Sequence, residues 1–220
     1  MTDISDIQAG ELHYETPDYG KPKSTEEFWA GEFGDDYTKR NRVDWIKRIP
    51  FWRDIVAKTG LGRVLEVGCN SGWNLSALRL IAPSWMELCG MDVNESALRE
   101  AGNLHFDTLP RYAPGGQDNL AHASYEYDFV FTAGVLIHVA PEDLKEMMEL
   151  ICGASSKYVL AIEYFAEQEE EVEYRGHAGK LWKRPYGKLY QDLGLKLLLQ
   201  GDVGKDDGFD TCRWWLLEKP

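Results

Sequence analysis

Carboxylates stand in or directly after three short apolar runs of this sequence. Glu66 lies in the run that leads into Gly68, and Asp92 ends a second run. Glu163 follows the run from Val159 to Ile162. A carboxylate at such a place can accept hydrogen bonds from hydroxyl groups, pair with an ammonium group or accept a proton. If the runs are parallel strands, their carboxyl ends meet at one edge of the sheet, where a ligand is expected.

A loop with two glycines follows the first run, in the segment Arg63-Val-Leu-Glu-Val-Gly-Cys-Asn-Ser-Gly-Trp73. Gly68 and Gly72 permit a tight turn and let the backbone approach a ligand without an intervening Cβ. Asn70 stands where many such loops have a third Gly, and Asn tolerates positive φ better than most residues. The periodicity from Trp73 to Ala82 predicts a helix whose first N–H groups point at the loop.

The acidic residues indicate which cofactor this unit suits. Asp92 follows Gly68 at about the spacing expected of the carboxylate that binds ribose hydroxyls in an adenosine site. A dinucleotide site would have Gly in place of Asn70, so that a pyrophosphate can sit on the helix. Glu66 instead suits a cation, such as the amino group of a methionine moiety. S-adenosylmethionine is therefore favoured, and methyl transfer is the leading hypothesis; the alternative is a structural turn that binds nothing.

A second group of candidates follows a predicted strand at Asp128–Thr132. His138 ends a segment that runs off this strand, which would place it beside the cofactor as a general base. The alternative is a histidine that only fixes a loop by hydrogen bonding. Glu163, followed by Tyr164, could accept a proton or orient a hydroxyl or amino group. Its alternative is a strand-end charge that faces water.

The elements that must position these residues alternate along the chain. Strands are expected at Val64–Val67, Met86–Met91, Asp128–Thr132, Tyr158–Ile162, Lys196–Leu199 and Cys212–Leu217. Helices are expected at Thr25–Trp29, Asn41–Ile49, Pro50–Lys58, Trp73–Ala82, Ser96–Gly102 and from Pro141 onward, with a turn at Gly31–Gly34 and a loop at Pro110–Gln117. This alternation predicts an α/β fold with a Rossmann-like, doubly wound sheet. We expect a flexible lead-in at 1–24, a helical lid or cap at 25–58 and a single domain at 59–220.

The composition fits one globular domain of 220 residues, of which 44% are hydrophobic. The sequence shows neither a secretory leader nor an apolar run long enough to span a bilayer, so a cytoplasmic location is expected. The formal net charge of −13 argues against nucleic-acid or membrane partners. Four scattered cysteines indicate free thiols, and no metal site is expected.

One basic segment follows the acidic run Glu167–Glu173. Its cations could hold a phosphorylated or carboxylated substrate, or they could belong to a solvated segment of mixed charge. They are Arg175, Lys180, Lys183, Arg184 and Lys188.

Three longer blocks carry a family resemblance: Phe28-Trp-Ala-Gly-Glu-Phe-Gly-Asp-Asp-Tyr-Thr-Lys-Arg-Asn41, Gly134-Val-Leu-Ile-His-Val139 and Tyr174-Arg-Gly-His-Ala-Gly-Lys-Leu-Trp-Lys-Arg184. With the glycine loop, they resemble class I S-adenosylmethionine-dependent methyltransferases, and more specifically the methylases associated with pseudaminic acid biosynthesis. The resemblance implies a seven-stranded sheet with its last strand antiparallel, and a sugar or nucleotide-sugar acceptor. The chain departs from the family pattern at Pro185-Tyr-Gly187 and at Gly201–Asp210, which could reshape the acceptor pocket.

The blocks add candidates with a physical rationale. Tyr37 and Arg42 could fold over the cofactor, with the Arg paired to the methionine carboxylate. Tyr174, Arg175 and His177 could line the acceptor site, where Arg175 would hold an anionic group. The complete cofactor set is Tyr37, Arg42, Glu66, Gly68, Asn70, Gly72, Asn74, Asp92, Val93 and Gly134. The acceptor set is Tyr164, Tyr174, Arg175 and Lys183.

The expected reaction is in-line displacement at the methyl carbon, with S-adenosylhomocysteine as the product. The protein would mainly align the reactants and exclude water, while a base removes the acceptor proton. The candidate bases are His138, Glu163 and His177. Other acceptors remain open, namely natural products, peptides or nucleic acid, and so do a nucleotide-dependent oxidoreductase and a non-catalytic binding protein of the same fold.

Overall fold

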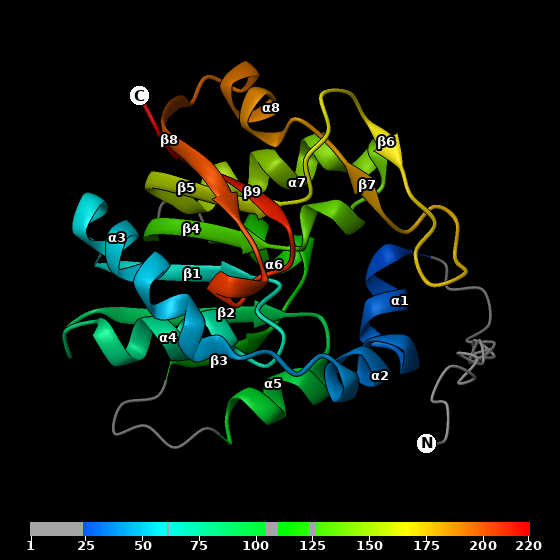
Figure 1. Cartoon of the computed structure of the whole chain (residues 1–220), viewed down its shortest axis with the longest axis horizontal. Helices are drawn as coiled ribbons and strands as arrows, with labels where there is room; N and C mark the ends of the chain where they lie inside the picture. Colours follow the sequence, from blue (N-terminus) through cyan, green and yellow to red (C-terminus); the bar gives the residue numbers. More distant parts are fainter. Residues whose placement is uncertain (1–23, 61, 104–109, 124–125) are drawn as a thin grey trace, which may run out of the picture.

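The structure is a computed structural model that describes residues 24–60, 62–103, 110–123 and 126–220. Within these residues, a seven-stranded sheet has the order β3-β2-β1-β4-β5-β9-β8 (Figure 1). Its strands are β1 (Arg63–Val67), β2 (Glu87–Asp92), β3 (Arg111–Pro114), β4 (Tyr127–Ala133), β5 (Ser155–Glu163), β8 (Lys196–Val203) and β9 (Cys212–Glu218). Neighbouring strands are parallel, except that β9 runs antiparallel to β5 and β8. The predicted fold, with an antiparallel last strand, is confirmed.

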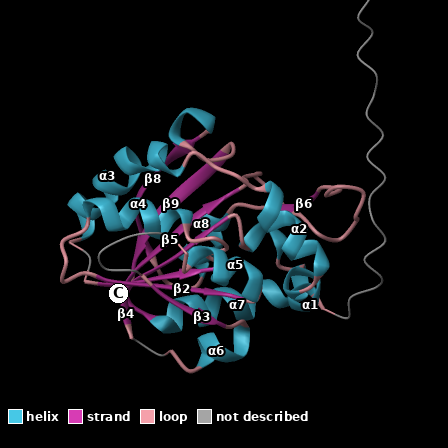
Figure 2. Ribbon diagram, turned by 90° about the horizontal axis from the view of Figure 1, so that it is seen from below, coloured by secondary structure: helices cyan, strands magenta, loops and turns pink. Residues whose placement is uncertain are grey.

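Helices cover both faces of this sheet (Figure 2). They are α3 (Ile49–Thr59), α4 (Trp73–Ile81), α5 (Glu95–Ala101), α6 (Gln117–Ala121), α7 (Pro141–Ala154) and α8 (Tyr186–Asp192). The first three pack on one face with Val64 and Phe129, and the last three pack on the other with Leu65 and Val130. Because side chains alternate along a strand, Glu66 shares the face of α3 and α4.

Two further helices, α1 (Thr25–Ala30) and α2 (Glu32–Arg40), lie across the carboxyl ends of the strands (Figure 1). We call them the lid. Asn94 Nδ2 donates to the Trp29 carbonyl at 3.1 Å and to Asp35 Oδ1 at 3.0 Å. Asn70 Nδ2 donates to Thr38 Oγ1 at 3.0 Å. The lid is therefore fixed to the loops that follow β1 and β2, whereas α3 belongs to the core.

Several local expectations differ from the structure. The expected turn at Gly31–Gly34 is shorter, since Gly31 alone separates α1 from α2 and Gly34 lies inside α2. Gly34 leaves no room for a side chain, because a Cβ there would lie 1.8 Å from the Trp29 carbonyl oxygen. The helix expected at Asn41–Ile49 is mostly absent: residues 41–44 are not helical, and the short 3₁₀ helix η1 (Trp45–Arg48) leads directly into α3. The expected loop at 110–117 contains the edge strand β3, and α8 was not predicted. Residues 1–23 of the expected lead-in lie outside the described residues.

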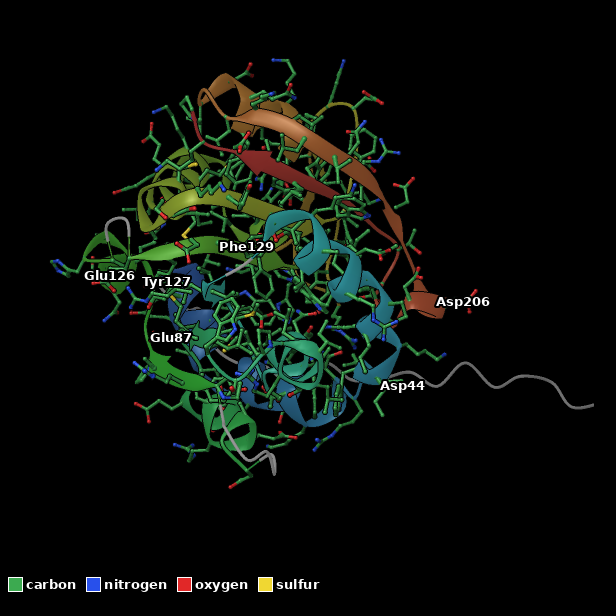
Figure 3. The ribbon with its side chains drawn as sticks, turned by 90° about the vertical axis from the view of Figure 1, so that its left-hand side faces the viewer. Asp44, Glu87, Glu126, Tyr127, Phe129 and Asp206 are labelled. Atoms are coloured by element: carbon green, nitrogen blue, oxygen red, sulfur yellow. The ribbon has the colours of Figure 1, made fainter. Side chains whose placement is uncertain are left out.

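The remaining short elements lie at the same end of the sheet or beside it. They are the 3₁₀ helices η2 (Leu136–His138) and η3 (Lys205–Asp207) and the hairpin strands β6 (Glu170–Glu171) and β7 (Trp182–Lys183). Figure 3 shows Asp44 and Asp206 on the same side of the molecule, where η1 and η3 meet. In the described ranges, no helix is both long and apolar enough to cross a membrane.

Candidate active site

A cavity of about 660 Å³ lies where the carboxyl ends of β1, β2, β3, β4 and β5 meet the lid. Its volume is typical of small-molecule sites. The predicted site residues that line it are Tyr37, Glu66, Gly68, Asn70, Asn74, Asp92, Val93, Gly134, His138, Tyr164, Tyr174 and Arg175. The predicted residues Arg42, Gly72, Glu163, His177 and Lys183 do not line it.

Glu66 contributes a buried carboxylate to the cavity wall. Its Oε1 accepts a hydrogen bond of 2.7 Å from Asn74 Nδ2, whereas its Oε2 has no partner within the described part of the chain. Burial raises the pKa of Glu66 to about 8, although Asn74 and the nearby Arg48 oppose this shift. A half-paired buried carboxylate of this kind favours a cationic ligand group.

Arg48 stands beside this carboxylate, which the sequence did not reveal. Its Nη1 donates to Asn74 Oδ1 at 2.9 Å, and its Nε donates to the Gly208 carbonyl at 2.8 Å. The guanidinium also lies 4.4 Å from the ring centre of Phe209. Burial lowers the pKa of Arg48, while Glu66 raises it. The cavity thus presents a guanidinium and a carboxylate side by side, which matches an amino-acid moiety.

Asp92 closes β2 and fixes the glycine loop. Its Oδ2 accepts the N–H of Asn70 at 2.7 Å, and its Oδ1 accepts the N–H of Asn94 at 2.8 Å. Burial raises the pKa of Asp92, although these backbone N–H groups oppose the shift. A ligand hydroxyl can use a lone pair that these bonds leave free on the carboxylate. Asn70 has φ of 46°, as the sequence predicted for this turn.

The glycines of the loop form the expected tight turn, but the space beside them is occupied. Gly68 and Gly72 have φ of 69° and 70°, which a tight turn requires. However, a Cβ at Gly68 would lie 2.4 Å from Val135, and one at Gly72 would lie 2.3 Å from the Tyr112 hydroxyl. The space left by the missing Cβ atoms is therefore filled by side chains of the chain itself and not open to a ligand.

His138 lines the cavity in η2, directly after β4. Its Nδ1 lies 2.7 Å from the Lys180 carbonyl oxygen. Because a carbonyl only accepts, Nδ1 carries the proton and Nε2 keeps a lone pair. Burial lowers the pKa of His138 to about 4, so the ring is neutral at pH 7. The ring lies between Trp29 and Tyr174, at 4.5 and 5.0 Å between centroids.

Glu163 is placed differently from the expectation that it acts as the base. The side chain is fully buried and does not line the cavity. Its two oxygens accept the N–H groups of Val135 and Ile137, each at 3.3 Å. Burial raises the pKa of Glu163 to about 7, against the effect of its hydrogen bonds. The carboxylate neither faces water nor faces a ligand, and it holds the loop that carries His138.

The structure also places the other predicted residues outside the cavity. Arg42 is exposed and pairs with Glu100. His177 packs edge-on against Phe28 and Phe33, with centroid distances of 5.5 and 5.6 Å, because the hairpin meets the lid there.

The basic segment does not form a groove. Arg175 lines the cavity, at φ of 51° in the two-residue turn that joins Tyr174 to His177. The other cations have partners elsewhere: Lys180 lies over Phe28, Lys183 is 4.0 Å from Glu170, Arg184 pairs with Glu169 and Lys188 pairs with Asp192.

The cavity wall contains two further groups that the sequence did not reveal. Trp29 lines the cavity, and its indole N–H has no hydrogen-bond partner among the described residues. Asp210 also lines the cavity and accepts a hydrogen bond of 3.0 Å from the Tyr164 hydroxyl. In the sequence, the only feature that pointed to Asp210 was the departure from the family pattern at Gly201–Asp210. Trp29 stood in the first of the three family blocks.

Comparisons with known proteins identify the family and similar folds. A family model for the methyltransferase domain matches residues 37–198, which is more than half of the 220-residue chain. A search of curated proteins gives no match. Magnesium protoporphyrin IX methyltransferase from Synechocystis PCC 6803, solved with bound S-adenosylhomocysteine, is 17% identical. The match covers 89% of this chain and 98% of that chain, with a TM-score of 0.63.

Two other solved structures are similar. Burkholderia thailandensis 1,6-didemethyltoxoflavin-N1-methyltransferase, with bound 1,6-didemethyltoxoflavin and S-adenosylhomocysteine, is 14% identical over 94% of this chain and 93% of that chain, with a TM-score of 0.69. The N-terminal domain of EvdMO1, in the presence of S-adenosylhomocysteine and D-fucose, is 17% identical over 79% and 82%, with a TM-score of 0.59. At these identities the structures show a common fold. The family match over most of the sequence shows that this chain belongs to the methyltransferase domain family.

Proposed function

We propose that this methyltransferase moves the methyl group of S-adenosylmethionine to an oxygen or nitrogen of a small-molecule acceptor, a sugar or nucleotide sugar. One observation carries the proposal. A single cavity contains a half-paired buried carboxylate beside a guanidinium and also contains a neutral imidazole with a free lone pair.

The residues of the cavity fit the cofactor. Glu66 Oε2 would take the ammonium group of the methionine moiety, and Arg48 would take its carboxylate. Asp92 would accept hydrogen bonds from the ribose hydroxyls through its remaining lone pairs. Val93 and Gly116, which follow β2 and β3 and also line the cavity, would lie against the adenine.

The acceptor would occupy the aromatic wall beside His138. Trp29 and Tyr174 offer ring faces that suit the apolar side of a sugar, and the Trp29 N–H can donate to it. Asp210 and Tyr164 offer oxygen atoms that can bind sugar hydroxyls. Arg175 would pair with a phosphate if the acceptor is a nucleotide sugar. The fold relative solved in the presence of D-fucose is consistent with such an acceptor.

His138 is the group that we assign to proton transfer. When bound, S-adenosylmethionine supplies a methyl group on a positively charged sulfur that leaves readily. A pKa of about 4 makes the imidazole a weak base, so it takes the proton only once the acceptor atom has become acidic through its new bond. The lid and the hairpin would exclude water from this end of the cavity when the ligands are bound.

Calorimetry with S-adenosylmethionine, S-adenosylhomocysteine and NAD tests the cofactor assignment. We expect binding of the two sulfur compounds alone. Arg48→Met should weaken that binding about 10- to 100-fold, since a charged hydrogen bond contributes roughly 1.5–3 kcal/mol. The matched variant Arg42→Met, at an exposed arginine outside the cavity, should bind normally.

The outcomes separate the alternatives. Binding of NAD alone would indicate an oxidoreductase, and binding of none of the three would indicate a non-catalytic protein. Transfer of labelled methyl groups should then be measured with free sugars, nucleotide sugars and planar aromatic compounds. Methylation of the planar compounds alone would refute the sugar assignment while leaving methyl transfer intact.

A further inference from the structure

Arg184 is buried to an unusual degree for a cation, with 1% of its surface exposed. Its Nη1 donates to the carbonyl oxygens of Leu136 at 3.1 Å and Val139 at 2.9 Å. Its Nε donates to Glu169 Oε2 at 2.7 Å, and the Glu169 side chain remains 47% exposed. Burying a guanidinium is costly unless it is paired. Here the pairing connects the hairpin segment to the carbonyl groups of the first residue of η2 and of the residue that follows η2. This turn contains His138.

The same segment also contacts the His138 ring. Lys180, four residues before Arg184, supplies the carbonyl that accepts the Nδ1 proton. On the opposite side of the loop, Glu163 accepts two backbone N–H groups of the turn. The turn is therefore held at two of its N–H groups by a carboxylate and at two of its carbonyl groups by a guanidinium.

We propose that Arg184 and Glu169 are a positioning pair, which holds the turn against the hairpin so that the Lys180 carbonyl selects one tautomer of His138. The Nε2 lone pair then stays in the cavity. This inference rests on the proposed role of His138 as the proton acceptor. It also gives a role to the block Tyr174–Arg184, which carries part of the family resemblance although few of its residues line the cavity.

The tautomer of His138 can be measured by nitrogen NMR on histidine-labelled protein, without cofactor or acceptor. His138→Gln identifies the signal among the five histidines. The wild type should show a single form protonated on Nδ1. Arg184→Lys and Glu169→Ala should show a mixture of tautomers, because the Lys180 carbonyl then no longer fixes the proton on Nδ1. Glu170→Ala, at the exposed neighbouring carboxylate, is the matched control and should keep the wild-type signal.

Each result bears on the proposal. A single Nδ1-protonated form of His138 in both folded variants would overturn it. If Arg184→Lys does not fold, Glu169→Ala decides, because the Glu169 side chain is 47% exposed and water can replace its contact with Arg184. A protein that fails to bind S-adenosylmethionine would refute the proposed function but would leave this NMR result unaffected.

Once an acceptor is identified, kinetics provide a second test. Both variants should lower kcat about 10- to 100-fold, since small misplacements of reacting groups have effects of this size. The dissociation constant of S-adenosylmethionine should stay unchanged. In a His138→Gln background the same substitutions should have no further effect on kcat. Additive losses in that background would show a merely structural role and would refute the positioning role.

Discussion

Replacing Glu66 by Gln should stabilise the cofactor-free protein and weaken cofactor binding. The carboxyl group is fully buried, and its pKa rises from 4.5 to about 8, chiefly through burial. At pH 7 the folded protein therefore keeps this group protonated, whereas the unfolded chain ionises it. Gln cannot ionise, and it retains an oxygen that can accept the Asn74 hydrogen bond.

The magnitude follows from linkage between protonation and folding. An acid whose pKa is higher in the folded state makes the protein less stable as the pH rises from the unfolded to the folded pKa. At 1.36 kcal/mol per pH unit, ionisable Glu66 costs about 3 kcal/mol at pH 7 and about 5 kcal/mol above pH 8. Glu66→Gln should remove this cost, so its stability gain should disappear near pH 4.5.

Urea unfolding of the wild type and Glu66→Gln at pH 4.5, 6, 7 and 8.5 provides the assay. The control is Glu126→Gln, at a carboxylate on the surface (Figure 3), which should show no such pH-dependent gain. Calorimetry should show about 10- to 100-fold weaker binding of S-adenosylmethionine to Glu66→Gln, because Gln cannot ionise to pair with the ammonium group, as Glu66 can when the ligand binds. A stability difference that does not change with pH, or a variant less stable than wild type at pH 7, would refute the reasoning.

Three further substitutions test the site. Asp92→Asn should weaken cofactor binding about tenfold and lower stability by roughly 1–3 kcal/mol, because its amide group meets a backbone N–H; unchanged affinity in calorimetry would remove Asp92 from the site. His138→Gln should lower kcat about 100-fold. In the wild type, protonation of His138 should lower kcat only when the pH falls towards 4. Glu163→Gln should lower kcat about tenfold by loosening the loop, with unchanged cofactor affinity. A loss as large as that of His138→Gln would instead support Glu163 as the base.

Local signals in the sequence were sufficient to predict the centre of the fold. Apolar runs of the right length mark the central strands, and the glycine loop with Asn70 predicts the turn between β1 and α4. The position of Asp92 follows from the same unit, because a strand, a turn and a helix fix where the next strand ends. Glu66 lies on the cavity wall for the same reason.

The remaining site residues depend on contacts between distant segments. Arg48 reaches the cavity through partners as far away in sequence as Gly208, 160 residues on, and no local pattern distinguishes it from Arg42. Trp29 and Asp210 likewise come from opposite ends of the chain. For Glu163, by contrast, the sequence indicated a site residue that does not line the cavity. A carboxylate after a buried strand looks the same in sequence whether it faces a ligand or accepts the N–H groups of a neighbouring loop.

The lid shares its attachment points with the strand end that would bind ribose. Asp92 holds the backbone of Asn70 and Asn94, and the side chains of these two asparagines bind α1 and α2. Opening of the lid would therefore break hydrogen bonds made by Asn70 and Asn94, and Asp92 holds both of these residues in place. If the lid moves aside when the spent cofactor leaves, the two events are linked, and such movements limit turnover in many enzymes. The overall rate of this chain would then be governed by the hydrogen bonds of two asparagines, some distance from the atom that accepts the methyl group.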